Sequence, residues 1–117
     1  MGKIYINDNQ ILLPQMIDIY KPIDFDWMGC KITRDATFTI HHIQKTSVGG
    51  KTTLDNCALL LKKSHRLLNM LENRDLGLYI AWNDLFKEIN FSMKPPTDSH
   101  VLEMKTLNRK TKSIIYR

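Results

Sequence analysis

ATFTIHHI, residues 36–43, is the stretch of sequence that decides the fold. Its β-branched and aromatic residues and its alternating character predict a strand. The short apolar run CALLL, residues 57–61, predicts a second strand, and a polar loop containing Gly49-Gly50 separates the two. From about Lys63 to Glu72 the leucines recur at helical spacing, which predicts a helix. The middle of the chain is therefore expected to run strand, loop, strand, helix.

Further elements are expected on both sides of this unit. Lys3–Ile6 and Ile11–Leu13 flank a turn-like cluster and predict two short strands. A second helix is expected from Asp75, a plausible N-cap, to about Asn90. The fold class is then α+β, in one domain over residues 1–117. Its parts are a core at about 25–72, a helical part at about 75–90, and a basic tail at about 94–117 that holds one more short helix.

Composition and charge limit the possible functions. The chain has 117 residues, 43% of them hydrophobic, which suits one soluble domain. No apolar run is long enough to span a bilayer, no secretion signal is evident, and two cysteines are too few for a disulfide scaffold. A cytoplasmic location is therefore expected. The net charge of +5 is concentrated in residues 41–66 and 94–117, each with a balance of +4, which suits nucleic acid. A solvated surface with a basic tail explains the charge equally well.

Three of the four histidines lie within the central unit. His41 and His42 are adjacent on the predicted strand, so their side chains point to opposite faces and cannot easily share one task. His65 lies on the first turn of the predicted helix, and Asn56 lies between them in the chain. This layout suits a one-metal phosphodiesterase, in which one histidine of the pair binds a cation with His65 and the other activates water. The ordinary histidine pKa of about 6.5 suits a base at physiological pH.

His41-His42-Ile43, Gly49-Gly50, Asn56, Leu59-Leu60-Leu61 and Ser64-His65-Arg66 together resemble the HNH endonuclease family, the ββα-metal or His-Me finger nucleases. The resemblance covers about residues 25–72. It implies a ββα-metal core, here with short N-terminal strands and additional C-terminal helices. Small stand-alone members resemble proteins found on phages and other mobile elements.

The resemblance also implies roles for single residues. His41 matches the first metal ligand, His65 the second, and His42 the general base. Asn56 matches the central asparagine that ties down the long loop and helps to fix the base. Asn69, one turn after His65 on the same helix face, is a further candidate ligand. The cofactor is expected to be a divalent cation, with Mg²⁺ as the first choice and Mn²⁺, Ni²⁺ or Zn²⁺ as alternatives.

The chain departs from the family pattern at the zinc-binding cysteines. Many members hold a structural zinc with two Cys-x-x-Cys pairs, which here would fall at Trp27 and Cys30 and at Leu61 and Ser64. Two cysteines cannot supply four thiolates, so no structural zinc is expected. Apolar packing of Trp27, Met28 and Leu61 is expected to fill that space. Core positions are also expected for Cys57, Tyr79, Trp82 and Phe86, while His100 is expected on the surface.

Basic side chains near the proposed site are candidates for contact with phosphate. They are Lys45, Lys51, Lys62, Lys63 and Arg66, with Arg66 favoured for the scissile phosphate. The favoured hypothesis is a metal-dependent endonuclease that acts on double-stranded DNA. The alternative is a non-catalytic module that binds nucleic acid or a protein partner on the same scaffold. Low intrinsic specificity, a homodimer or a targeting partner would compensate for the lack of a separate sequence-reading domain.

Overall fold

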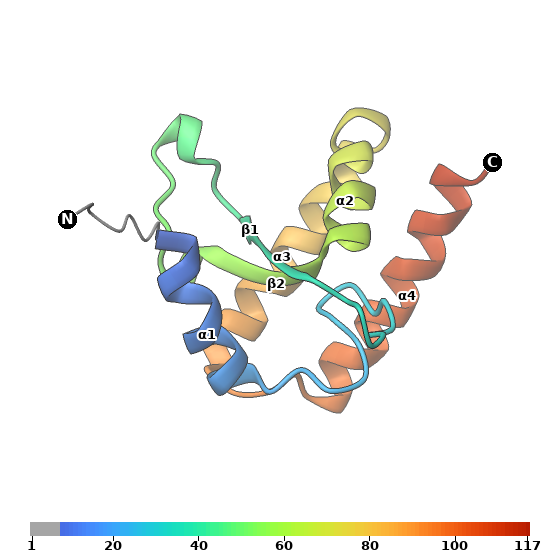
Figure 1. Ribbon diagram of the computed structural model, residues 1–117. Coiled ribbons are helices and arrows are strands. Elements are labelled where there is room, and N and C mark those ends of the chain that lie inside the picture. Colours follow the sequence, from blue (N-terminus) through green and yellow to red (C-terminus); the bar gives the residue numbers. More distant parts are fainter. Residues whose placement is uncertain (1–7) are drawn as a thin grey trace.

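The computed structural model describes residues 8–117, which form an α+β fold around a two-stranded antiparallel hairpin (Figure 1). Two single turns of 3-10 helix, Thr46–Val48 and Leu54–Asn56, lie in the loop between the strands. The predicted order of strand, loop, strand and helix is confirmed. The other elements are α1 (Asp8–Tyr20), β1 (Phe38–His42), β2 (Cys57–Leu61), α2 (Lys62–Arg74), α3 (Leu76–Ser92) and α4 (Asp98–Ile115).

The hairpin places the central residues in a fixed register. β1 and β2 pair from Phe38 opposite Leu61 to His42 opposite Cys57. Every residue of β2 is buried, because α2 and α3 both pack against that strand. α2 begins at the residue after β2, rises from the end of that strand (Figure 1), and contacts both strands of the hairpin. The two histidines of β1 and the single histidine of α2 therefore belong to one continuous structural unit.

The N-terminal prediction is corrected by α1. Residues 11–13 are helical, and the strand predicted there is wrong; Lys3–Ile6 lies outside the described residues. Leu12, Met16 and Tyr20 are buried at a spacing of four residues and form the stripe that packs on the core. Three adjacent apolar residues do not distinguish a strand from a helix, whereas this longer periodicity does.

The C-terminal prediction is also corrected. Residues 98–115 form one long helix instead of a short helix with a frayed tail. Its N-terminus carries a capping box, in which Thr97 accepts a hydrogen bond from the His100 backbone and the His100 ring accepts one from Thr97. Further along the helix, Thr111 is buried and accepts a 2.9 Å hydrogen bond from the Trp82 indole. The hydrogen bond between Trp82 and Thr111 therefore anchors α4 to α3.

The expected core residues are buried. Trp82 and Phe86 stack on each other in α3, and Tyr79 lies on the same face. Asp75 caps α3 as predicted, since its carboxylate accepts a hydrogen bond from the Leu78 backbone. Trp27, Met28, Leu61 and Cys57 are buried as well.

Among residues 8–117, no helix combines the length and apolar character that spanning a membrane requires.

A buried carboxylate joins the segment before β1 to the end of β2. Asp26 is 1% exposed, and its Oδ1 accepts hydrogen bonds from the backbone of Met28 at 3.0 Å and of Cys30 at 2.9 Å. Its Oδ2 accepts a 2.9 Å hydrogen bond from the backbone of Leu61, the last residue before α2. Burial raises the pKa of Asp26, while the hydrogen bonds act in the opposite direction. The side chain therefore fixes the position at which α2 leaves the sheet.

Asp26→Asn is expected to lower the free energy of unfolding by about 1–3 kcal/mol, because an amide N–H replaces one accepting oxygen and leaves a backbone donor unpaired. Urea unfolding followed by circular dichroism measures this change. Asp24→Asn is the matched control, since Asp24 is exposed. Equal unfolding midpoints for the two variants would contradict the role given to Asp26.

Candidate active site

Three histidines line one pocket of about 250 Å³ between β1, the loop that follows it, α2 and α3. The structure thus brings together His41, His42 and His65, although His65 follows the pair by more than 20 residues in the sequence. Two other predicted residues, Asn69 and Lys45, line the same pocket. The remaining lining residues are Thr46, Ser47, Glu72 and Tyr79.

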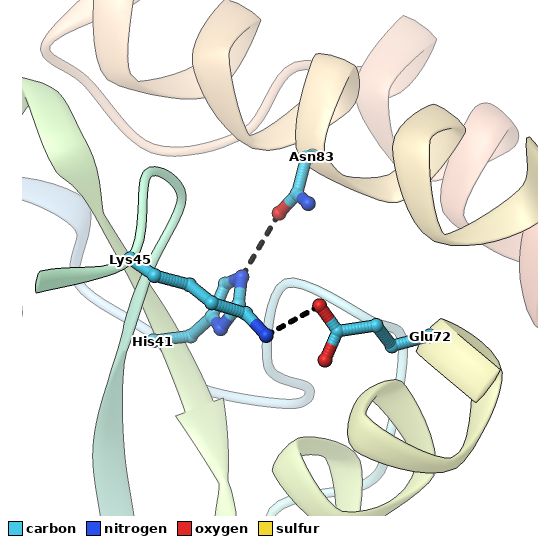
Figure 2. Close-up of polar contacts among 4 residues, drawn as sticks. All are labelled: His41, Lys45, Glu72 and Asn83. Carbon is cyan, nitrogen blue, oxygen red and sulfur yellow. Dashed lines mark hydrogen bonds and ion pairs between the residues drawn. The ribbon is translucent and has the colours of Figure 1, made fainter. Parts of the chain in front are cut away.

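His41 is held by α3. It is 5% exposed, and its Nε2 lies 2.9 Å from the side-chain oxygen of Asn83, to which it donates a hydrogen bond (Figure 2). The rings of Tyr79 and Phe86 pack edge-on against it, with centroids 6.3 and 5.8 Å away. Burial lowers the pKa of His41 to about 4, so the ring is neutral at physiological pH. Nδ1 then carries the free lone pair, which is what a metal ligand requires.

His65 is oriented by a hydroxyl group of β1. The Thr39 hydroxyl donates its proton to the carbonyl of Leu60 at 2.8 Å, so it must accept the 3.1 Å hydrogen bond from Nδ1 of His65. This network leaves Nε2 of His65 without a proton. Burial also lowers the pKa of His65, with a smaller effect from His42 in the same direction. His65 therefore offers a second neutral nitrogen.

The two neutral rings are candidate ligands for a divalent cation. The centroids of His41 and His65 are 5.5 Å apart, and the rings are nearly perpendicular at 82°. Asn69, one turn further along α2, lines the same pocket and is exposed. Within residues 8–117 no three His, Cys, Asp or Glu side chains form a metal-ligating group. An amide oxygen, water or substrate oxygen would complete the coordination, which suits the ligand preferences of Mg²⁺ and Mn²⁺.

His42 has a different partner from its neighbour. Its Nε2 lies 2.8 Å from the Thr52 hydroxyl in the long loop, and the ring is partly exposed. The alternation of a strand explains the difference, because His41 points toward α2 and α3 while His42 points toward the loop. The two adjacent histidines are thus free to do separate tasks, as the sequence predicts.

Asn56 fastens the loop that carries the partner of His42. Its side-chain oxygen accepts a 2.8 Å hydrogen bond from the backbone of Gln44, and its amide donates to the carbonyls of Gln44 and Lys51 at 3.0 and 2.8 Å. Its own carbonyl accepts a hydrogen bond from Ile43. Asn56 does not line the histidine pocket, so it acts on loop position rather than on the pocket directly.

The two glycines make this loop tight rather than flexible. Gly49 has a φ of 92°, in the left-handed region that favours glycine. A Cβ atom at Gly50 would lie 1.8 Å from the carbonyl oxygen of Gln44, so no larger residue fits. The pair turns the chain back on itself after the 3-10 turn, with the Gly50 amide bonded to the Lys45 carbonyl. Lys45 is therefore carried by a closed turn.

The predicted basic residues do not form one cluster. Lys45 forms an ion pair with Glu72 of α2 at 2.5 Å across the rim of the histidine pocket (Figure 2). Its pKa is raised, chiefly by the hydrogen bond to Glu72. Lys51 and Arg66 are exposed and do not line this pocket, whereas Lys62 and Lys63 line a separate one. Of the predicted set, Lys45 is thus the residue placed at the histidines.

Sequence reasoning missed four residues that shape the site. Thr39 and Thr52 orient histidines, and short polar residues of this kind carry little signal in a single sequence. Asn83 had a usable signal, because it is a polar residue within the buried stripe of α3 and is itself 7% exposed. Glu72 lies seven residues after His65, two helical turns further along the same face of α2.

A hairpin followed directly by a helix, with a histidine pair on the first strand and a third histidine on the first helical turn, is compatible with a ββα core. The family model described as HNH endonuclease matches residues 28–69, a little over a third of the chain. The matched segment contains His41, His42, Asn56 and His65. Comparison with curated proteins and with solved structures gave no significant match.

Asn83→Ala is expected to destabilise the protein by about 1–3 kcal/mol, because it leaves the buried Nε2–H of His41 without an acceptor. Urea unfolding measures the change. The neighbouring Asp84 is exposed, so Asp84→Ala serves as the control on the same helix. If both variants unfolded at the same urea concentration, the hydrogen bond would not be holding His41.

Proposed function

We propose that the protein is a metal-dependent endonuclease that hydrolyses phosphodiester bonds of double-stranded DNA. The observation that carries this proposal is one pocket lined by three histidines, two of which offer neutral nitrogens whose orientation is fixed by partners. The match of residues 28–69 to the HNH endonuclease family model supports it. By resemblance, the products would carry 5′-phosphate and 3′-hydroxyl ends.

In this proposal His42 removes a proton from the attacking water. When its Nε2–H donates to the Thr52 hydroxyl, Nδ1 has a free lone pair that can accept the proton. Partial exposure of the ring gives water access to it. Asn56 is a positioning residue, because it ties the loop that carries Thr52 to the start of the same loop. Thr52 in turn fixes the ring of the base.

His41 and His65 would hold the divalent cation, with Asn69 as a candidate third protein ligand. Mg²⁺ is the proposed ion, and Mn²⁺, Ni²⁺ and Zn²⁺ are compatible with the imidazoles. The bound cation supplies positive charge that stabilises the phosphate group as it reacts. The protein's own contribution is preorganisation, since Asn83 and Thr39 fix both rings before any ligand arrives.

Lys45 is the basic residue that this arrangement assigns to the reacting phosphate. It is the lysine that lines the histidine pocket, and half of its side chain is exposed. Glu72 holds the ammonium group over the pocket while no phosphate is bound (Figure 2). A phosphate group would compete with Glu72 for the same charge. Lys51, Lys62, Lys63 and Arg66 are proposed to contact the nucleic-acid backbone away from the cleavage point.

The biological setting is proposed from simple features of the chain. Cys30 and Cys57 are both free and buried, which fits a reducing, cytoplasmic environment. One domain is proposed for the whole chain, acting as a homodimer or with a protein partner that directs it to its target. A phage or other mobile element is the proposed source.

His42→Ala is expected to reduce cleavage of supercoiled plasmid at least about 100-fold in Mg²⁺ or Mn²⁺, because no other group takes over the general base. Gel electrophoresis of nicked and linear products measures the rate. His100→Gln is the matched control, since His100 lies outside the pocket and glutamine can preserve the capping box. Equal cleavage by wild type and His42→Ala would overturn the assignment.

A non-catalytic binding module is the second candidate function. One observation favours it: in the described part of the chain, the pocket has two neutral imidazoles and no third ionisable ligand converging with them. This module would bind DNA but would not cleave it in any divalent cation. Salt-sensitive DNA binding by wild type without cleavage would establish this function in place of the first.

His65→Ala is expected to abolish metal binding. At about 100 times its dissociation constant, Mn²⁺ should stabilise the wild type by about 2.7 kcal/mol. Thermal unfolding with and without Mn²⁺ measures this effect independently of activity, and His100→Gln should retain it. A full Mn²⁺-dependent shift in His65→Ala would show that the cation binds elsewhere.

A further inference from the structure

A second pocket, of about 590 Å³, lies away from the histidines. Three parts of the chain form it: residues 29–37, the end of β2 with the start of α2, and one side of α4 with the residue that follows it. The last part contributes Asn108 and Lys112 of α4 and its C-cap Tyr116, at four-residue spacing. Four lysines line it, namely Lys31, Lys62, Lys63 and Lys112. We call it the lysine pocket.

The charge in the lysine pocket is largely unbalanced. Asp35 is the one acidic residue that lines it, against four lysines. Among residues 8–117 the ion pair between Lys45 and Glu72 stands alone, so none of these four lysines has an acidic partner. Burial raises the pKa of the Cys30 thiol in the pocket wall. The positive charges of Lys63 on α2 and Lys112 on α4 both act in the opposite direction and lower it. The two helices therefore direct positive charge to the same place.

The lysine pocket and the histidine pocket share α2. Lys62 and Lys63 occupy the first turn of the helix, and His65 and Asn69 follow on the face that lines the histidine pocket. Along the hairpin, Thr37 in the lysine pocket precedes His42 by five residues, which is about 16 Å of extended chain. At about 3.4 Å per base pair this separation corresponds to roughly five base pairs of DNA. One duplex is thus long enough to reach both pockets.

We propose that the lysine pocket binds backbone phosphates of the DNA substrate at a distance from the cleavage point. This inference rests on the proposed nuclease function and adds a second contact with the substrate. Mobile lysines suit phosphates as point charges and read no base sequence. The contact would fix the direction in which the duplex crosses α2. α4 then takes part in substrate binding, because it supplies Lys112 and one wall of the pocket.

The test is the salt dependence of DNA binding by a paired variant. Lys63→Gln/Lys112→Gln removes one charge from each helix that lines the pocket. Fluorescence anisotropy with a labelled 20-base-pair duplex in EDTA measures binding without cleavage. At physiological salt the variant is expected to bind about tenfold more weakly, and the slope of log affinity against log salt should fall by about 1–2. Lys94→Gln/Lys105→Gln is the control. These two substitutions remove the same amount of charge from exposed lysines that line neither pocket.

Three results would overturn the proposal: an unchanged salt slope, equal losses in both paired variants, or a different occupant of the pocket. A different occupant would be indicated if inorganic phosphate raised the melting temperature of wild type but not of Lys63→Gln/Lys112→Gln, while the two proteins bound DNA equally well. If that variant did not fold, Lys31→Gln/Lys62→Gln would replace it, since both side chains are exposed. Plasmid cleavage is scored separately, so failure of nuclease activity is distinguishable from failure of this DNA contact.

Discussion

The carboxylate of Asp26 is the interaction on which the arrangement of the ββα unit depends. It accepts hydrogen bonds from three backbone N–H groups that belong to two distant segments, and it is buried where water cannot replace it. In many HNH endonucleases, the family that the sequence resembles, a structural zinc held by four cysteines links the two corresponding segments. Here Trp27 and Leu61 pack at two of those positions, and a carboxylate makes the link. Hydrogen bonds to a buried charge are stronger than neutral ones, which suits this role.

The chemistry of the site follows from the two-residue period of β1. Thr39 and His41 lie on the same face, where one orients His65 and the other packs beside it. His42, on the other face at the end of the strand, meets the loop instead. Adjacent residues of the same type therefore occupy different environments: His41 is 5% exposed and neutral, while His42 reaches water. The strand therefore separates the proposed ligand from the proposed base over a single peptide bond.

The sequence predicts the parts of the molecule in which local pattern and chemistry agree. The strands around Ile40 and Leu59, the cap at Asp75 and the buried face of α3 are each predicted by alternation, an apolar run, a capping residue or helical spacing, and each is confirmed. At Ile11–Leu13 the apolar run was too short for its period to be determined. In α4 the buried residues Met104, Leu107 and Thr111 are few and are separated by charged residues, so the helical spacing of its buried face is hard to recognise in the sequence. Partners such as Asn83 depend on how α3 crosses the hairpin, which no local pattern specifies.

The residues that tune the histidines lie partly outside the segment that matches the HNH endonuclease family model. That segment ends at residue 69, before Glu72, Tyr79 and Asn83. A unit of this size cannot bury enough apolar surface to be stable alone, so α1, α3 and α4 complete its core. Because α3 also supplies the hydrogen-bond acceptor and the aromatic wall for His41, the same helix that stabilises the fold sets the protonation state of the proposed ligand. The family motif therefore accounts for which residues meet in the pocket, and the added helices account for their environment.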